Sequence, residues 1–338
     1  MMSRGAAPGR VSVAPMFEGF ARQWTPLVPL TRLSAKPARL RVAGQDLVVW
    51  RAPDGEVGVL LDQCPHRGVS LALGTARPDG SLACGFHGWE FGPDGACRHI
   101  PFNPGARRER FDARALPVVV AGGFVWVFTG FEPTGGALAG PVYSDVLDRA
   151  DLVRFDHVEE WDCHWTRAME NMLDFPHLPY VHRTTIGRFV RAKQHRHSRL
   201  RFDLENTDYG FRFGARLDHH EPSAHLSWWR PHGMSLDTVP EPRMMRLHVW
   251  CVPVDRLRTR MILTSVRNFA MSPAASPAFD RLNVTILRQD RAVVESSQPT
   301  VVPGGTSERS VPTDRPTLRF RTFYHRRLAE SRELDPRG

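Results

Sequence analysis

Two cysteines and two histidines near the N-terminus have the types and spacing of metal ligands. Cys64 and His66 are followed, after seventeen residues, by Cys84 and His87. Two thiolates and two imidazoles suit a two-iron, two-sulfur cluster in which histidines replace cysteines on one iron and raise its reduction potential. A structural zinc ion also takes two cysteines and two histidines. Zinc fingers, however, pair cysteine with cysteine and histidine with histidine. Each half here carries one of each, so we predict the cluster.

A second group of potential ligands lies in the middle of the chain. Asp174 and His177 are three positions apart, which places them on one face if the segment is helical. His182 follows five positions after His177, about 140° further round an ideal helix, so an unbroken helix would not bring the two rings together. Pro179 disfavours helical geometry at Leu178 and predicts a break there. We therefore predict that His177 and His182 are metal ligands rather than ordinary surface or core histidines.

A single acidic residue, Asp290, interrupts an apolar stripe in a predicted helix. The stripe comprises Phe279, Leu282, Ile286, Val293 and Val294 at helical spacing. A carboxylate on a buried face is costly unless it pairs with a cation or binds a metal. A salt bridge to a buried arginine is one interpretation. The other is a third metal ligand, because two histidines and one carboxylate form the facial triad of oxygen-activating iron(II) enzymes. An electron-supplying cluster and such an iron in one chain predict an oxygenase.

Size and composition are those of an ordinary globular protein. The 338 residues exceed the length at which single cores usually stop growing, so two domains are expected. No stretch approaches the ~20 consecutive apolar residues that span a bilayer, and the start lacks the apolar core of a signal peptide. Five cysteines, an odd number, favour a reduced, cytoplasmic compartment. The net charge of +9 is scattered. No nucleic-acid motif accompanies it, so we expect a solvated surface or a site for an acidic redox partner.

The patterning predicts an α+β protein with a β-rich first domain. Residues 39–62 carry a hairpin pattern, and residues 123–128 predict a buried strand. We expect a flexible tail at residues 1–15, a β domain at 16–140 and a second domain at 141–338, with a Gly/Pro-rich boundary at 130–145. The second domain is expected to be an antiparallel sheet with helices packed against it. Its helices are predicted near 162–178 and 277–298, its strands near 199–217, 224–230, 243–254 and 258–270, and a surface-wrapping tail after 300.

Several longer motifs resemble those of a known family. Cys64-Pro-His66-Arg-Gly, Cys84-Gly-Phe-His87-Gly-Trp and Gly95-Ala-Cys-Arg-His-Ile-Pro101 resemble the N-terminal domain of the Rieske non-haem iron oxygenases. Glu170-Asn-Met-Leu-Asp174-Phe-Pro-His177-Leu-Pro-Tyr-Val-His182 is similar to the iron-binding helix of their catalytic domain. Gln289-Asp290-Arg-Ala-Val-Val-Glu-Ser-Ser-Gln298 is similar to the segment that supplies the carboxylate. The resemblance covers nearly the whole chain and is greatest to the single-subunit monooxygenase and O-demethylase branch.

The resemblance implies both the fold and the cofactors. The fold is an all-β Rieske domain followed by a helix-grip-like catalytic domain. A Rieske 2Fe–2S cluster would be held by Cys64, His66, Cys84 and His87, and a mononuclear Fe(II) by His177, His182 and Asp290. The resemblance also implies a homotrimer in which Asp174 bridges His87 of one subunit to His177 of the next. Without the family, Asp174 is an acid on a helix surface.

The resemblance further implies a reaction and partners. The enzyme would use O2 to hydroxylate or demethylate a small organic substrate. Its electrons would come from an external NAD(P)H-dependent reductase, with or without a ferredoxin, because the chain has no G-x-G-x-x-G fingerprint of its own. Desaturation and oxidative cyclisation are alternative reactions of the same chemistry. A non-enzymatic Rieske electron carrier and a zinc-dependent hydrolase are alternatives of other classes.

Overall fold

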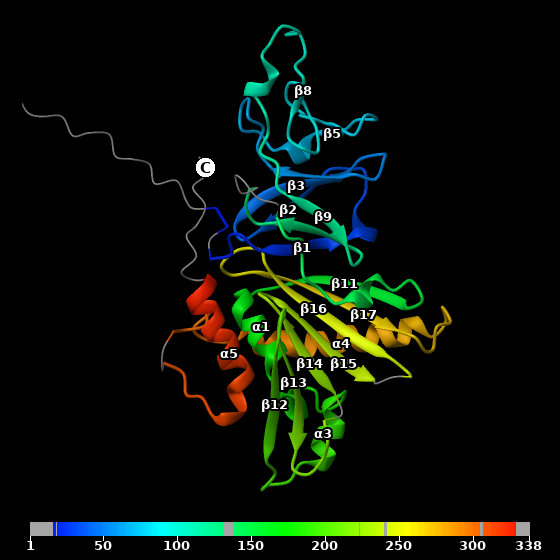
Figure 1. Ribbon diagram of the computed structural model, residues 1–338, viewed down its shortest axis with the longest axis vertical. Helices are drawn as coiled ribbons and strands as arrows, with labels where there is room; N and C mark the ends of the chain where they lie inside the picture. The colour runs from blue at the N-terminus through cyan, green and yellow to red at the C-terminus, as the bar shows by residue number, and fades with distance from the viewer. Residues whose placement is uncertain are drawn as a thin grey trace, which may run out of the picture.

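A β-rich part and a large antiparallel sheet with helices make up the molecule in Figure 1, a computed structural model. The structure describes residues 16–17, 19–131, 138–222, 224–239, 242–304 and 307–328. The tail predicted at residues 1–15 lies outside the described residues, as do residues 132–137 within the predicted boundary. The domain limits therefore stay a prediction.

Three small antiparallel sheets form the N-terminal part. One contains β1 (Trp24–Pro29), β10 (Phe124–Phe128) and β9 (Val118–Ala121); the second contains β2 (Ala38–Val42), β3 (Gln45–Arg51) and β4 (Val57–Leu61). The third contains the short strands β5 (Thr75–Ala76), β6 (Leu82–Ala83), β7 (Glu90–Phe91) and β8 (Cys97–His99). The hairpins predicted for residues 39–62 and the buried strand predicted at 123–128 are present. The loops that carry Cys64 and Cys84 follow β4 and β6.

One seven-stranded antiparallel sheet forms the centre of the second part. Its order is β11 (Val153–Trp161), β17 (Thr259–Arg267), β16 (Met245–Pro253), β15 (Gly233–Val239), β14 (His225–Trp229), β13 (Gly210–Leu217) and β12 (Leu200–Thr207). The predicted α+β class is confirmed. Strands β11 and β15 were not predicted. In β15, Gly-Met-Ser-Leu-Asp-Thr-Val, apolar and polar residues alternate only over Met234–Asp237, a run too short to identify a strand without its partners β14 and β16.

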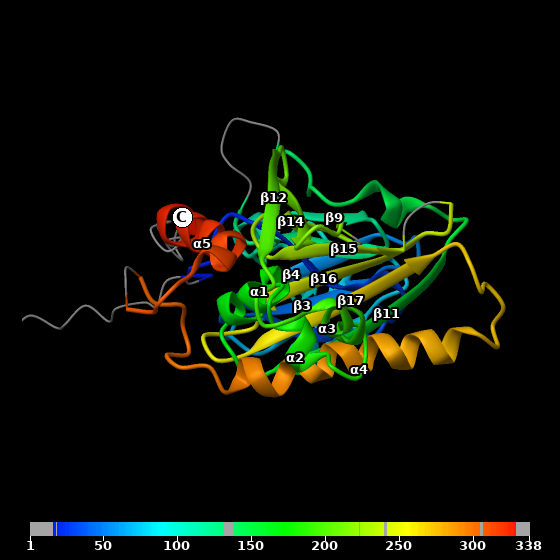
Figure 2. The same cartoon turned by 90° about the horizontal axis from the view of Figure 1, so that it is seen from below.

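Within the described residues, five α-helices accompany this sheet. They are α1 (Trp165–Leu173), α2 (Leu178–Val181), α3 (Gly187–Lys193), α4 (Ser276–Glu295) and α5 (Arg315–Phe323), which continues into the π-helical turn η6 (Tyr324–Leu328). The short 3-10 helices η4 (Asp145–Asp148) and η5 (Pro312–Asp314) lie in the same part, whereas η1 (Leu30–Arg32), η2 (Leu71–Leu73) and η3 (Arg108–Arg110) lie in the N-terminal part. Figure 2 shows α4 lying along one face of the sheet, near α2 and α3. The surface-wrapping tail predicted after residue 300 is wrong, because it contains α5. Phe320 of α5 is fully buried, with its ring 5.7 Å from that of Trp165 in α1.

The two parts share one apolar core. Trp126 of β10 packs edge-to-face on Trp250 of β16, with ring centroids 5.0 Å apart. A buried polar contact, 2.7 Å from Thr25 Oγ1 to His232 Nε2, joins β1 to the turn before β15. The small sheet β1-β10-β9 is therefore packed directly against the seven-stranded sheet. Among the described residues, no helix is long and apolar enough to cross a membrane.

Candidate metal centres

The two loops that carry the predicted cluster ligands are built alike. The backbone N–H of Cys64 donates to the carbonyl of Val69, and that of Cys84 to the carbonyl of Trp89, both at 2.8 Å. In each loop the glycine four positions after the cysteine donates back to the cysteine carbonyl, at 2.8 and 3.0 Å. These glycines, Gly68 and Gly88, have φ angles of +71° and +70°, which L side chains rarely adopt. The same tight turn is therefore formed twice, and it presents its cysteine and histidine together.

The four side chains divide into an inner and an outer pair. Cys64 and Cys84 are buried, whereas His66 is half-buried and His87 is exposed. The two imidazole centroids lie 4.7 Å apart, and His66 stacks on Trp89 at 4.3 Å. Burial raises the pKa of the Cys64 thiol to about 11; the backbone amide of His66 lowers it and the neighbouring Cys84 thiol raises it. Two adjoining thiols inside, an amide directed at sulfur and two imidazoles outside fit a cluster with unlike ligands on its two irons.

The second predicted ligand set converges on one point. One ligand atom from each of His177, His182 and Asp290 can be chosen so that all lie within 4.8 Å of one another. Asp290 Oδ1 lies 3.5 Å from His177 Nε2 and 3.1 Å from His182 Nε2. The two rings are inclined at 67°, with centroids 5.1 Å apart. His177 immediately precedes α2, His182 immediately follows it, and Asp290 lies in the C-terminal half of α4.

Asp290 has the environment of a ligand rather than of a salt-bridge partner. It is 4% exposed, and its Oδ1 forms no hydrogen bond that meets the usual geometry, although His182 Nε2 and His177 Nε2 lie 3.1 and 3.5 Å away. A buried carboxylate oxygen without a hydrogen bond is costly, and a metal between the three side chains would satisfy it. No arginine pairs with Asp290 among the described residues. Burial lowers the pKa of His182, but the Asp290 carboxylate and Gln289 outweigh burial and raise it overall. The donor set therefore fits a divalent iron.

The Nδ1 atom of each of these two imidazoles also has a hydrogen-bond partner. His177 Nδ1 lies 3.0 Å from Asp174 Oδ2, and His182 Nδ1 lies 2.9 Å from Gln289 Oε1. Gln289 Oε1 also accepts from the Thr185 hydroxyl at 2.7 Å. Such partners orient a ligating histidine and leave its Nε2 directed at the metal. The sequence did not identify Gln289 as a positioning residue; its only signal was that it precedes Asp290.

The local geometry differs from the prediction at two places. Asp174 has extended dihedral angles and ends α1, so Asp174 and His177 do not share a helical face. The chain breaks before His177, and Pro179 lies in the first turn of α2, where a missing N–H costs nothing. The two residues nevertheless meet, because Asp174 Oδ2 also accepts the backbone N–H of His177 at 3.0 Å.

The apolar stripe predicted on α4 is partly wrong. Leu282 and Val293 are 43% and 49% exposed, whereas the buried residues of α4 are Asn283, Ile286, Leu287, Asp290 and Val294. Leu282 and Val293 lie about 80–100° round the helix from Asn283, at 100° per residue, so they flank the buried stripe. The prediction that Asp290 is on the buried face is confirmed.

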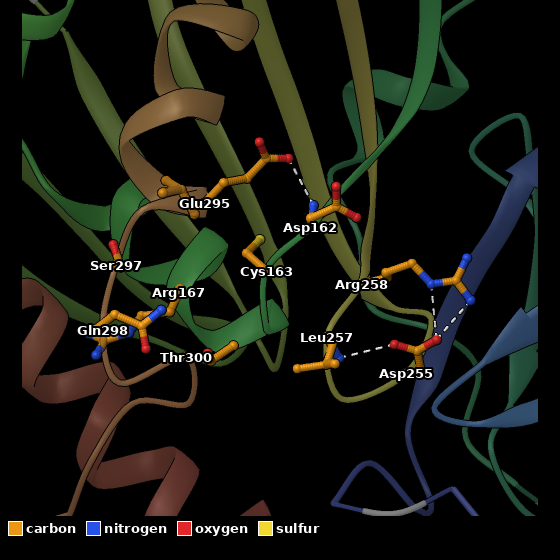
Figure 3. Close-up of a pocket in the computed structure, with 11 residues that line it drawn as sticks. Asp162, Cys163, Arg167, Asp255, Leu257, Arg258, Glu295, Ser297, Gln298 and Thr300 are labelled. Carbon is orange, nitrogen blue, oxygen red and sulfur yellow. Dashed lines mark hydrogen bonds and ion pairs between the residues drawn. The ribbon is translucent and has the colours of Figure 1, made fainter.

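A separate pocket of about 470 Å3 lies at the C-terminal end of α4 (Figure 3). Asp162 and Cys163 line it beside Glu295 and the β16–β17 turn. His177, His182 and Asp290 are not among the residues that line this pocket. The pocket is therefore separate from the candidate metal centre formed by His177, His182 and Asp290.

Comparisons with known proteins identify the family of both parts of the chain. Residues 23–116 match the family model of the Rieske [2Fe-2S] domain, and residues 161–330 match that of the vanillate O-demethylase oxygenase C-terminal domain. The second match alone covers half of the chain. The protein therefore belongs to the Rieske oxygenases, in the group with a catalytic domain of the vanillate O-demethylase type.

Relatives of the chain include O-demethylase components. It is 30% identical over 206 residues to the 5,5'-dehydrodivanillate O-demethylase oxygenase subunit of Sphingobium sp. (strain NBRC 103272 / SYK-6), covering 59% of this chain and 47% of that protein. It is 35% identical over 153 residues to the dicamba O-demethylase oxygenase component of Stenotrophomonas maltophilia, covering 45% and 44%. The chain thus spans about half the length of the curated relatives it matches.

The same fold is found in a solved oxygenase structure. Dicamba monooxygenase bound to dicamba superposes with a TM-score of 0.75 at 21% identity, covering 92% of this chain and 97% of that chain. At this identity the likeness establishes the fold alone.

Proposed function

We propose that the protein is the oxygenase component of a Rieske-type monooxygenase system that hydroxylates or demethylates a small organic substrate. In such a reaction one oxygen atom of O2 enters a C–H bond and the other leaves as water, with two electrons and two protons supplied from outside. Demethylation follows when the new hydroxyl is on an O-methyl carbon, because the resulting hemiacetal releases formaldehyde. The O-demethylase relatives favour this branch.

The observation that carries the proposal is the convergence of His177, His182 and Asp290 in a chain with a Rieske domain. A plain electron carrier has no use for a buried site with three converging ligands and a carboxylate oxygen that lacks a hydrogen bond. When bound, a Rieske cluster supplies single electrons and a facial-triad iron activates dioxygen beside the substrate. Cys64, His66, Cys84 and His87 are the proposed cluster ligands, and His177, His182 and Asp290 the proposed iron ligands.

The chain's own residues would prepare the iron site. Asp174 and Gln289 hold the Nδ1 atoms of the two histidines, so each Nε2 is directed inward without a rotation of the ring. Three side chains on one side leave the opposite side open for dioxygen and substrate. Burial of His182 and Asp290 excludes bulk water from the ligand side.

Electron delivery between neighbouring subunits would account for the positions of His87 and Asp174. Within one chain the cluster loops, next to β5 and β8, and helix α3, which follows the iron-ligand segment, lie at opposite ends of the molecule (Figure 1). His87 is exposed, and Asp174 makes both contacts to His177 with Oδ2, so Oδ1 has no partner among the described residues. We propose a homotrimer in which Asp174 Oδ1 accepts a hydrogen bond from the neighbour's imidazole, so that one carboxylate links the two centres.

The electron source is proposed to be a separate NAD(P)H-dependent reductase, with or without a ferredoxin. The excess of basic residues would favour an acidic redox partner. All five cysteines are free and buried, which supports a reducing, cytoplasmic compartment.

Metal analysis and oxygen uptake test the proposal. Anaerobically purified protein should contain about three irons and two sulfides per chain and show a Rieske-type spectrum. With a surrogate reductase and NADH, it should consume oxygen faster when a substrate is present and release formaldehyde from O-methyl substrates. One zinc and no sulfide would contradict the whole proposal. Two irons and no substrate-dependent uptake would indicate an electron carrier.

A further inference from the structure

A single surface segment carries most of the net charge. Residues 183–201 run from the turn after His182 through α3 to the start of β12, and they contain seven cations and no Asp or Glu. The whole chain has a net charge of +9, so the remaining residues contribute only +2. The positive charge, which looks scattered along the sequence, is therefore concentrated here. We call this stretch the cationic segment; its cations are Arg183, Arg188, Arg191, Lys193, Arg196, Arg199 and Arg201.

These seven cations lack counter-ions. All of them are exposed, and within the described part of the chain none lies within ion-pair distance of a carboxylate. The nearby acids have other partners. Asp218 accepts the backbone N–H of Arg199 at 2.6 Å, and Asp203 and Glu221 both pair with Arg216. Like charges held on one surface repel one another, so an acidic partner would be attracted to the segment and would relieve this repulsion.

Two exposed aromatic rings lie beside these cations. Tyr180 of α2 and Phe189 of α3 are 67% and 62% exposed. The Arg188 guanidinium lies over the Phe189 ring, 4.7 Å from its centroid, and Gln194 Nε2 donates to the Tyr180 hydroxyl at 2.9 Å. Aromatic residues and arginine are enriched at protein interfaces and lysine is depleted, and six of the seven cations are arginines. This composition favours a protein partner over a nucleic acid or a lipid surface.

The cationic segment adjoins the candidate iron site. His182 directly precedes it, and the backbone N–H of Gly187, at the start of α3, donates to the His182 carbonyl at 3.0 Å. Figure 1 shows α3 and the beginning of β12 at the end of the molecule away from β5 and β8. In the proposed homotrimer, this end receives His87 of the neighbouring subunit. A protein bound to the cationic segment would then lie beside the neighbour's cluster.

We propose that the cationic segment, with Tyr180 and Phe189, is the surface on which an acidic electron-transfer protein docks to recharge the cluster of the neighbouring subunit. The inference rests on the proposed function and names the docking site of its electron donor. In each docking event the reduced donor loses one electron and the oxidised cluster gains it, so two events supply the two electrons of one turnover. Opposite charges steer such an encounter and make its rate fall as ionic strength rises.

Rapid mixing of the oxidised holoenzyme with a reduced acidic protein tests the docking surface. The probe is a plant-type 2Fe–2S ferredoxin, and the change in Rieske absorbance gives the second-order rate constant of cluster reduction. The double variant Arg188→Glu/Arg191→Glu should lower this rate constant about tenfold or more at low ionic strength, because electrostatic steering is lost. Arg188→Lys/Arg191→Lys keeps both charges and should stay close to the wild type.

A second double variant is the matched control. Lys36 and Arg309 are exposed cations outside the segment, so Lys36→Glu/Arg309→Glu changes the net charge equally and should leave the rate constant nearly unchanged. Iron content, sulfide content and subunit assembly should match the wild type in every variant, because only exposed side chains are changed. Oxygen uptake driven by a small chemical reductant, without the ferredoxin, reports on the proposed function separately.

Several results would overturn the docking surface. One is a wild-type rate constant that does not fall with ionic strength, and another is an unchanged rate constant in Arg188→Glu/Arg191→Glu. An equal loss in Lys36→Glu/Arg309→Glu would show that only the net charge matters. Binding of duplex DNA or phosphatidylglycerol vesicles at physiological ionic strength, lost in Arg188→Glu/Arg191→Glu, would assign the segment to a nucleic acid or a membrane instead.

Discussion

The two candidate metal centres are built in opposite ways. The proposed cluster ligands lie within twenty-four consecutive residues, on two copies of one turn whose hydrogen bonds are local. The proposed iron ligands come from the two ends of α2 and from α4, more than a hundred positions apart, and meet because α4 packs along the sheet. A local site depends on backbone geometry at a few glycines. A site assembled from distant elements depends on packing and on the residues that aim each side chain.

The largest expected effect is the loss of one centre, the mononuclear iron, while the cluster is retained. Asp290→Ala should keep the Rieske spectrum and lose mononuclear iron and turnover, because the remaining two imidazoles do not complete the facial triad. Iron analysis, visible absorbance and coupled oxygen uptake measure the three properties. Glu295→Ala, an acid one turn further along α4 that pairs with Arg291, should retain all three. Turnover that survives in Asp290→Ala would show the carboxylate assignment to be wrong.

The next largest effect is expected at Asp174, the proposed link between the two centres. Asp174→Asn should retain both metals but lower turnover about 10–100-fold, since a partner of a ligating histidine typically contributes that much. Rapid mixing of the pre-reduced enzyme with O2 and substrate should show slow oxidation of the cluster. Asp151→Asn, at an exposed acid on the surface, serves as the control. Normal cluster oxidation in Asp174→Asn would remove the bridge from the proposed mechanism.

A substitution at Gln289 tests whether the iron site depends on the residues that orient its ligands. Such dependence is expected of a site assembled from distant elements. Gln289→Leu leaves His182 Nδ1 without its partner, so iron affinity should fall about 10–100-fold at the mononuclear site alone. Chelator competition followed by iron analysis measures this loss. Gln194→Leu removes only an exposed contact to the Tyr180 hydroxyl and should have no effect. Unchanged iron retention in Gln289→Leu would mean that packing alone aims His182.

The smallest effect concerns the local site. Gly88 has a φ of +70°, so Gly88→Ala should destabilise the second cluster loop by about 1–2 kcal/mol, the cost of a left-handed conformation with a Cβ. We expect faster loss of the 2Fe–2S absorbance on heating, with mononuclear iron retained. Gly105→Ala is the control, because nothing lies within 4 Å of its added Cβ. Equal cluster lifetimes in the two variants would contradict the role assigned to the turn.

The sequence by itself determined which residues could carry the chemistry. The cluster motifs could be recognised because Cys64, His66, Cys84 and His87 are close in the chain and their turns require glycine. Asp290 could be found because a carboxylate on a buried helical face needs a partner. The α+β class followed from the changing periodicity along the chain, and the structure confirms it.

Only the tertiary structure decided how distant residues meet. The break before His177, the exposed flank of α4 at Leu282 and Val293, and strand β15 depend on neighbours that the local pattern does not contain. The same is true of Gln289 on His182 and of the exposure of the seven cations between Arg183 and Arg201. A side chain's hydrogen-bond partners and its burial are properties of packing between elements, so no single segment of sequence specifies them.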